Sequence, residues 1–261
     1  MEEKEVLTGG RVGKIIKEGN CVVRPSNVWT KEVHKFLNYL LEHGFTEIPV
    51  PYGINEAGKE VVSFAEGVVY NDELPDFILR DEILEAVAKR MVHYHEIGAA
   101  YVDKLSGNEA WMLKTQYPIE VMCHGDIAPY NTTFVGTELG GMIDFDTLHP
   151  GPRLWDIAYA VYRWVPFVSP ENPDYHDGAE EQIRKLKVFA DAYGLGEQER
   201  KKLPEMMIAR VESLMEFMRE QATAGNEDMA RNIAEGHLDL YINDVAYMRT
   251  HMEAMAEGMC K

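Results

Sequence analysis

The sequence predicts an α+β fold, in which a small β-rich N-terminal part precedes a larger helical part. Up to about residue 68, short runs rich in Val and Ile are bounded by Gly and Asn turns, and one stretch of helical spacing interrupts them. Beyond that point, apolar residues recur at three-and-four spacing in long segments. We therefore expect two domains, residues 1–67 and residues 68–261.

The N-terminal part is predicted to contain one helix among several strands. The expected strands are 11–16, 21–24 and 61–64. Thr30 is the expected N-cap of the helix, which ends before Gly44. Its apolar face consists of Val33, Phe36, Leu37, Leu40 and Leu41. Residues 49–53 hold Pro and Gly typical of a turn, and residues 55–60 are predicted to form a hairpin tip.

The C-terminal part is predicted to be mainly helical. The expected helices are 78–100, 153–165, 179–193, 197–223 and 227–257. Between the first two of these, three short apolar runs predict a small β region. These runs are 119–123, 132–135 and 141–145.

Charge and composition exclude several classes of function. The chain has 261 residues, of which 46% are hydrophobic, and such a chain can bury a sizeable core. Its net charge of −18 excludes a general basic surface for nucleic acid. The charge is uneven, because residues 1–68 hold 8 Lys/Arg and 10 Asp/Glu, whereas the remainder holds 18 and 34. The helical part is the acidic one and favours a cationic partner.

Cysteine content and hydropathy favour an intracellular protein. The three cysteines are an odd number without a Cys-x-x-Cys pair, which favours neither a disulfide framework nor a zinc cluster. The first residues, MEEKEVLTGG, are acidic and polar, and no run of apolar residues approaches the length of a membrane span. We expect a cytoplasmic protein with no membrane partner, acting as a monomer or a homodimer.

The segment 123–159 carries the most informative pattern. His124, Gly125 and Asp126 are followed by Asn131 five positions after Asp126, and then by Asp144 in an apolar run. Phosphoryl transfer needs a carboxylate that orients and deprotonates the attacking hydroxyl, and oxygen ligands that hold Mg²⁺ against the nucleotide phosphates. Asp126 fits the first requirement, and Asn131 and Asp144 fit the second.

This pattern resembles the aminoglycoside phosphotransferase and choline kinase family, which has a protein-kinase-like fold. The specific resemblance covers His-Gly-Asp-x4-Asn, Ile-Asp-Phe-Asp and the Trp-Asp at 155–156. It implies ATP and Mg²⁺ as cofactors, with Asp126 as the catalytic base and Asn131 and Asp144 as metal ligands. It also implies that His124 braces the catalytic loop and that Asp156 helps to hold it.

The N-terminal part departs from the family pattern. Gly9, Gly10 and Gly13 form only a weak phosphate loop, and Arg24 stands where the resemblance implies a lysine. Arg24 keeps the positive charge and can fork onto phosphate oxygens, or it is a surface arginine. Glu32 lies near the place of the helix glutamate that would pair with it.

The resemblance also implies that an adenine ring binds at the junction of the two domains. Phe64 and Ala65 are the candidates for this contact, which needs main-chain groups and apolar walls, and an ordinary strand end is the alternative.

The acceptor is expected to be a small molecule that carries a hydroxyl, such as an aminoglycoside or another cationic compound. The aromatic residues of 153–165 either form a wall for a quaternary ammonium or pack in the core; they are Trp155, Tyr159, Tyr162 and Trp164. Asp146 either approaches a second metal or caps the turn before Pro150.

Two other functions remain open from the sequence. The first is a catalytically weakened nucleotide-binding or regulatory protein, which the departures at Arg24 and the glycine loop favour. The second is a metal-dependent hydrolase, which needs more close His or Asp ligands than Asp146 supplies.

Overall fold

The structure, a computed structural model, describes residues 4–7, 15–71 and 73–261. Contacts between Cα atoms divide the chain into two compact units. The first comprises Met1–Ile78 and Arg90–Arg153, and the second comprises Leu79–Lys89 and Leu154–Lys261. The boundary expected after residue 67 lies inside the first unit and stays a prediction.

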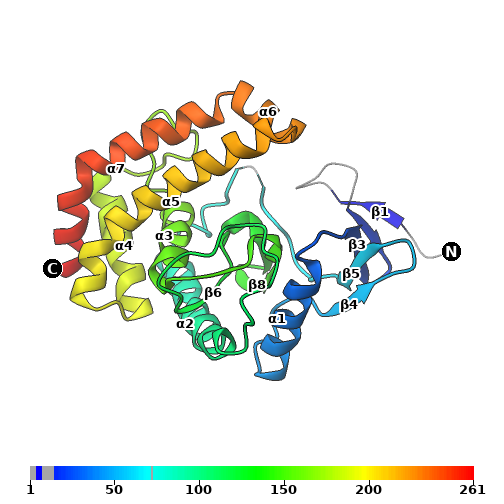
Figure 1. Ribbon diagram of the computed structural model, residues 1–261. Coiled ribbons are helices and arrows are strands. Elements are labelled where there is room, and N and C mark those ends of the chain that lie inside the picture. The colour runs from blue at the N-terminus through cyan, green and yellow to red at the C-terminus, as the bar shows by residue number, and fades with distance from the viewer. Residues whose placement is uncertain (1–3, 8–14, 72) are drawn as a thin grey trace. The chain divides into compact units, whose positions relative to one another are not determined.

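An antiparallel five-stranded sheet forms the N-terminal part of the first unit (Figure 1). Its order is β1-β2-β3-β5-β4, and the strands are Lys4–Val6 (β1), Ile16–Glu18 (β2), Cys21–Pro25 (β3), Lys59–Ser63 (β5) and Pro51–Ile54 (β4). Strands β3 and β5 are neighbours, and their register places Arg24 opposite Glu60. Residues directly opposite in an antiparallel pair project to the same face of the sheet, so this register decides which side chains meet.

Helix α1, Thr30–Glu42, lies beside this sheet and contacts β4 (Figure 1). The helix forms because its apolar residues recur on one face, and Val33, Phe36, Leu37 and Leu40 are buried. The expected N-cap was wrong, since Thr30 is the first residue of the helix and Trp29 precedes it as the cap. The Thr30 hydroxyl instead accepts a hydrogen bond from the backbone N–H of Asn27.

Three expectations for the strands need correction or lie outside the described residues. The turn expected at 49–53 is strand β4 from Pro51 onward, an edge strand where the missing N–H of a proline is tolerated. The run 141–145 is a strand only at its start, because β8, Glu138–Met142, ends there and Asp144 has a left-handed backbone. Most of the strand expected at 11–16 and the glycines Gly9, Gly10 and Gly13 lie outside the described residues.

Besides the five-stranded sheet, the described part of the first unit contains two short antiparallel strand pairs and two 3₁₀ turns. The paired strands are Val121–Cys123 (β6) with His149–Gly151 (β9), and Thr132–Val135 (β7) with Glu138–Met142 (β8). The turns η1, Pro129–Asn131, and η2, Phe145–Thr147, follow β6 and β8. These turns carry or flank the residues that the sequence singled out.

The second unit is helical. Helix α2, Asp81–Val102, begins in it and continues into the first unit. The other helices are Arg153–Trp164 (α3), Ala179–Tyr193 (α4), Glu197–Thr223 (α5), Glu227–Ala234 (α6) and His237–Cys260 (α7). The single helix expected at 227–257 is therefore two helices, because Gly236 adopts a φ of 92° that breaks the helical path.

The aromatic residues of α3 belong to the core. Trp155, Tyr159, Tyr162 and Trp164 are all at most 7% exposed. The guanidinium of Arg210 lies 4.3 Å from the ring centre of Tyr159 and 5.5 Å from that of Trp155. Tyr159 and Trp155 therefore contact a cation of the same unit, and packing in the core is the interpretation that the structure favours.

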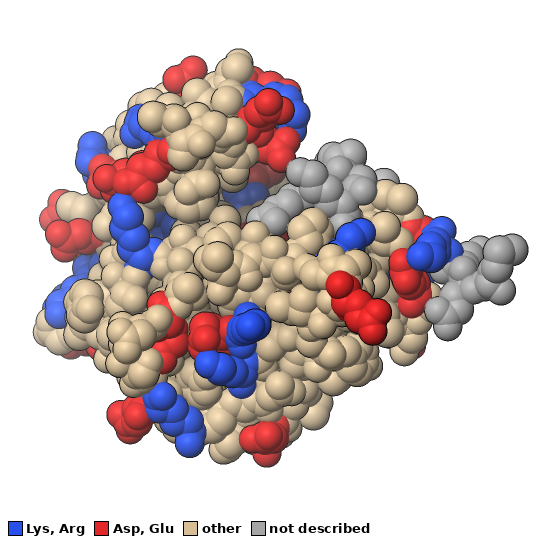
Figure 2. All heavy atoms as spheres, turned by 45° about the vertical axis from the view of Figure 1, so that its right-hand side comes forward, with Lys and Arg blue, Asp and Glu red and all other residues tan. Residues whose placement is uncertain are grey.

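Two further observations concern the surface. Figure 2 shows acidic and basic side chains scattered among uncharged residues on the face that it draws. Among the described helices, none combines the length and the apolar character of a membrane span.

Candidate active site

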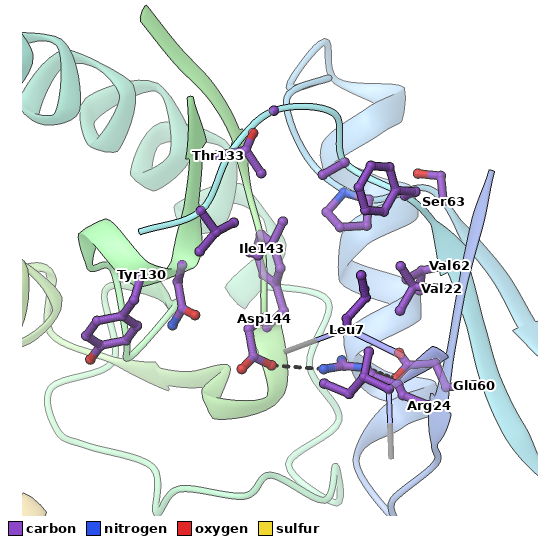
Figure 3. Close-up of a pocket in the computed structure, with 18 of the residues that line it drawn as sticks. Leu7, Val22, Arg24, Glu60, Val62, Ser63, Tyr130, Thr133, Ile143 and Asp144 are labelled. Carbon is purple, nitrogen blue, oxygen red and sulfur yellow. Dashed lines mark hydrogen bonds and ion pairs between the residues drawn. The ribbon is translucent and has the colours of Figure 1, made fainter. Parts of the chain in front are cut away.

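A pocket of about 550 Å³ in the first unit collects most of the predicted site residues. It is lined from β3, β5, the segment after β5 and the loops around η1 and η2 (Figure 3). The predicted residues that line it are Arg24, Phe64, Ala65, Asp126, Asn131 and Asp144. A volume of this size suits a small-molecule or cofactor site.

The loop after β6 holds Asp126 by both carboxylate oxygens. The Tyr130 hydroxyl donates to Asp126 Oδ1 at 2.7 Å, and the Asn131 amide donates to Oδ2 at 2.9 Å. Gly125 permits the tight turn, since its φ is 83° and a Cβ there would lie 2.7 Å from the Thr147 carbonyl oxygen. The predicted base is therefore fixed in orientation at the pocket wall.

His124 links this loop to the segment that carries Asp144. The ring is buried, and its Nε2 lies 3.1 Å from the carbonyl oxygen of Ile143. Its Nδ1 accepts a hydrogen bond from the backbone N–H of Asp126 at 3.3 Å. The ring also packs on Phe145, with 4.4 Å between the ring centres. These contacts fit the bracing role that the resemblance implies for His124.

The two predicted metal ligands offer oxygen atoms of the type that a hard divalent cation prefers. Asp144 has a φ of 61°, a left-handed conformation that Asp tolerates, and its side chain is 46% exposed. The Asn131 amide nitrogen also donates to the Asp126 carbonyl at 3.0 Å, which directs its Oδ1 elsewhere. The donor set fits Mg²⁺ rather than a softer metal. Within the described ranges, no group of three or more His, Cys, Asp or Glu has the arrangement of a metal site.

Arg24 forms the centre of the charged part of the pocket (Figure 3). Its Nε donates to Glu60 at 2.5 Å, and its two terminal nitrogens donate to Asp144 at 2.9 Å and to Asp146 at 3.0 Å. Burial by itself lowers the pKa of Arg24, but the carboxylates of Asp146, Asp144 and Glu60 outweigh it and hold the pKa above its ordinary value. Arg24 is thus a pocket residue and not a surface arginine.

The partner of Arg24 is Glu60, a residue that the sequence analysis missed. Glu60 was assigned to a hairpin tip, but it belongs to β5 and is 1% exposed. Its other oxygen lies 2.8 Å from Nε2 of His34 on α1. Glu32 instead pairs with Lys35 on the same helix. An acidic residue directly before the apolar pair Val61-Val62 was the signal that could have identified Glu60.

The segment after β5 forms the apolar side of the pocket. The backbone N–H of Phe64 donates to the Asn20 carbonyl at 2.9 Å, so this amide is already engaged. Lys17 lies over the Phe64 ring at 3.9 Å from its centre. Gly67 allows the segment to pass close to β7, because its φ is 117° and a Cβ would lie 2.7 Å from the Phe134 carbonyl oxygen.

Comparison with known protein families finds a match over the same segment of the chain. Residues 99–189 match the sequence model of the phosphotransferase enzyme family, and this range includes His124, Asp126, Asn131 and Asp144. The predicted resemblance to this family is confirmed over these residues, which are a minority of the chain. No curated protein matches the chain significantly.

Solved structures of several small-molecule kinases share the fold. An ethanolamine kinase of Plasmodium vivax matches with a TM-score of 0.61 and 13% identity over 96% of this chain and 81% of its own. Aminoglycoside 2'-phosphotransferase-IIIa in complex with GDP matches with a TM-score of 0.61 and 17% identity over 94% and 93%. The amicoumacin kinase hAmiN, in complex with AMP-PNP and Ca²⁺, matches with a TM-score of 0.60 and 13% identity over 89% and 88%. The predicted protein-kinase-like α+β fold is confirmed.

Proposed function

We propose that the protein transfers the terminal phosphate of ATP, with Mg²⁺, to a hydroxyl of a small cationic molecule. The observation that supports this most is the convergence of Asp126, Asn131, Asp144 and Arg24 on one pocket. In this proposal Asp126 is the catalytic base, His124 braces its loop, and Arg24 binds the phosphates. Asn131 and Asp144 hold the metal, which neutralises phosphate charge when it is bound.

The same proposal assigns the remaining predicted residues. Residues 1–67 form the nucleotide lobe and residues 68–261 the catalytic and substrate lobe. Phe64 and Ala65 contact the adenine ring with apolar surface and with the main-chain groups that Asn20 does not engage. The three cysteines form no disulfide among the described residues, which supports a reducing, cytoplasmic location for a monomer or homodimer.

The acceptor class rests on charge and on the relatives. Residues 69–261 carry 18 Lys/Arg and 34 Asp/Glu, and such a surface raises the local concentration of cations. The names of the similar structures include an ethanolamine kinase and aminoglycoside phosphotransferases, and both of these acceptor types carry amines. We therefore place amino alcohols and aminoglycosides first among the acceptors to test.

The test compares wild type with Asp126→Asn in a transfer assay against a panel of aminoglycosides, choline-like amines and hydroxy amino acids. Loss of the base is expected to lower kcat by about 10²–10⁴-fold. Asn keeps the shape of the side chain, so thermal unfolding is expected to change little. An undiminished rate in the folded variant would contradict the proposal. Tight nucleotide binding without transfer to any acceptor would favour the regulatory alternative.

A further inference from the structure

The guanidinium of Arg24 is bound to a buried carboxylate at its Nε, and its terminal nitrogens lie toward the pocket. Its Nε is bound to Glu60, whose side chain is 2% exposed, and one terminal nitrogen donates to Asp144 (Figure 3). The other terminal nitrogen donates to Asp146. The Asp144 side chain is 46% exposed. The guanidinium therefore uses its buried edge for anchoring and its outer edge for groups at the pocket. A lysine would have to serve both sides from one nitrogen, whereas the planar guanidinium presents separate nitrogens on its two edges.

Glu60 is itself held from two sides. One carboxylate oxygen accepts from Arg24 of the neighbouring strand, and the other lies 2.8 Å from His34 Nε2 of helix α1. The register that sets Arg24 opposite Glu60 fixes the first contact, and the buried face of α1 supplies the second. A buried carboxylate is tolerated only when its oxygens are satisfied in this way.

We propose that Glu60 and His34 are the positioning residues of Arg24, and that together they hold its outer edge in place for nucleotide phosphates. This inference rests on the proposed function, since it concerns how a phosphate-binding arginine is oriented. In this proposal, residues of strand β5 and helix α1 together orient Arg24, a role for which the resemblance implied one helix glutamate. The proposal also gives a physical reason for an arginine at position 24.

The first experiment measures binding of MgATP and of adenosine by calorimetry, using the full chain. Glu60→Gln keeps the size of the side chain and removes the charge that orients Arg24. We expect MgATP affinity to fall by at least about tenfold, while adenosine affinity stays unchanged. Glu32→Gln, which removes a helix acid that pairs with Lys35, is the matched control and is expected to change neither affinity. Unchanged MgATP binding, or an equal loss for adenosine, would overturn the inference.

The second experiment separates the hydrogen bond of His34 from its bulk. His34→Gln retains a nitrogen donor that can reach Glu60, whereas His34→Ala does not. We expect His34→Ala to weaken MgATP binding without weakening adenosine binding, and His34→Gln to restore most of the loss. Equal behaviour of the two variants would overturn the role of His34.

A third measurement needs no nucleotide and keeps the inference distinct from the proposed function. Urea unfolding is measured for Arg24→Ala, His34→Ala and the double variant. Residues of one hydrogen-bonded network show non-additive effects, so the shift of the double variant is expected to differ from the sum of the single shifts. Additive shifts would overturn the network. A wild type that binds no MgATP would instead contradict the proposed function, and this cycle would still test whether Glu60 and His34 hold Arg24.

Discussion

At the scale of single residues, the hydrogen bonds of Asp126 suggest how the predicted base is held. Tyr130 engages one of its oxygens and Asn131 the other. An acceptor hydroxyl that approaches Asp126 must share or displace one of these partners. The hydroxyl of Tyr130 is the more easily replaced of the two, because Asn131 is also bound to the Asp126 carbonyl.

Substitution of Tyr130 tests this orientation. Tyr130→Phe removes one donor to Asp126 and retains the ring, and we expect kcat to fall by up to about tenfold, less than for Asp126→Asn. Tyr117→Phe is the control, because Tyr117 is 79% exposed. Steady-state transfer assays measure the effect. An unchanged kcat would indicate that the bond from Tyr130 does not orient the base.

Asp144 makes a different prediction, because its role depends on the metal. Titration of nucleotide with and without Mg²⁺ is expected to show tighter binding with Mg²⁺ in wild type and no such difference in Asp144→Ala. Asp146→Ala distinguishes the two roles left open for Asp146. A retained response to Mg²⁺ would favour a turn-capping role, and a reduced response would favour a second metal. An Asp144→Ala variant that still responds fully to Mg²⁺ would contradict the predicted ligand.

At the scale of secondary-structure elements, Asp244 of α7 joins several segments of the second unit. It accepts hydrogen bonds from Tyr162 of α3 at 2.7 Å, from the Ser169 backbone at 2.8 Å and from Asn172 at 2.8 Å. Burial raises the pKa of Asp244, although these three donors work in the opposite direction. The side chain is fully buried, and its three hydrogen bonds connect α7 to α3 and to the 169–172 segment.

Removal of this carboxylate is expected to be costly. Asp244→Ala leaves three buried donors without their acceptor, and each unsatisfied group costs about 1–3 kcal/mol. We expect a loss of at least about 3 kcal/mol of unfolding free energy, measured by urea denaturation. Glu253→Ala on the same helix is the control, because Glu253 is exposed. A loss similar to that of the control would show that α7 is held by apolar packing alone.

At the scale of the whole molecule, the buried Glu60 predicts a dependence of stability on pH. Burial alone would raise the pKa of Glu60, but the hydrogen bond from His34 and the charge of Arg24 outweigh it, so the pKa lies below the ordinary 4.5. A carboxylate with a lowered pKa in the folded state stabilises that state above its unfolded pKa. This contribution is lost as the pH falls through the folded pKa.

The measurement is urea unfolding of wild type and Glu60→Gln from about pH 7 downward. We expect the stability advantage of wild type to be constant at neutral pH and to shrink below 4.5. The difference between the two proteins cancels the titration of the other carboxyl groups. An advantage that grows on acidification would contradict the stated direction of the shift.

The sequence by itself predicted the candidate site residues and determined most of the helices. Asp126, Asn131 and Asp144 stand at fixed spacing, and the helices α3, α4 and α5 follow directly from their apolar periodicity. Such patterns can be recognised in the sequence because the residues of each pattern lie in one continuous segment. The break at Gly236 was missed, since a glycine inside a periodic run does not reveal its φ.

Only the tertiary structure decided what surrounds Arg24. Its partners Glu60, Asp144 and Asp146 lie 36, 120 and 122 positions further along the chain. The pairing of β3 with β5 sets the contact of Arg24 with Glu60. The contacts with Asp144 and Asp146 lie at the left-handed turn of Asp144, which leads into η2. Strand register and loop closure depend on the packing of distant segments, and no local pattern in the sequence encodes them.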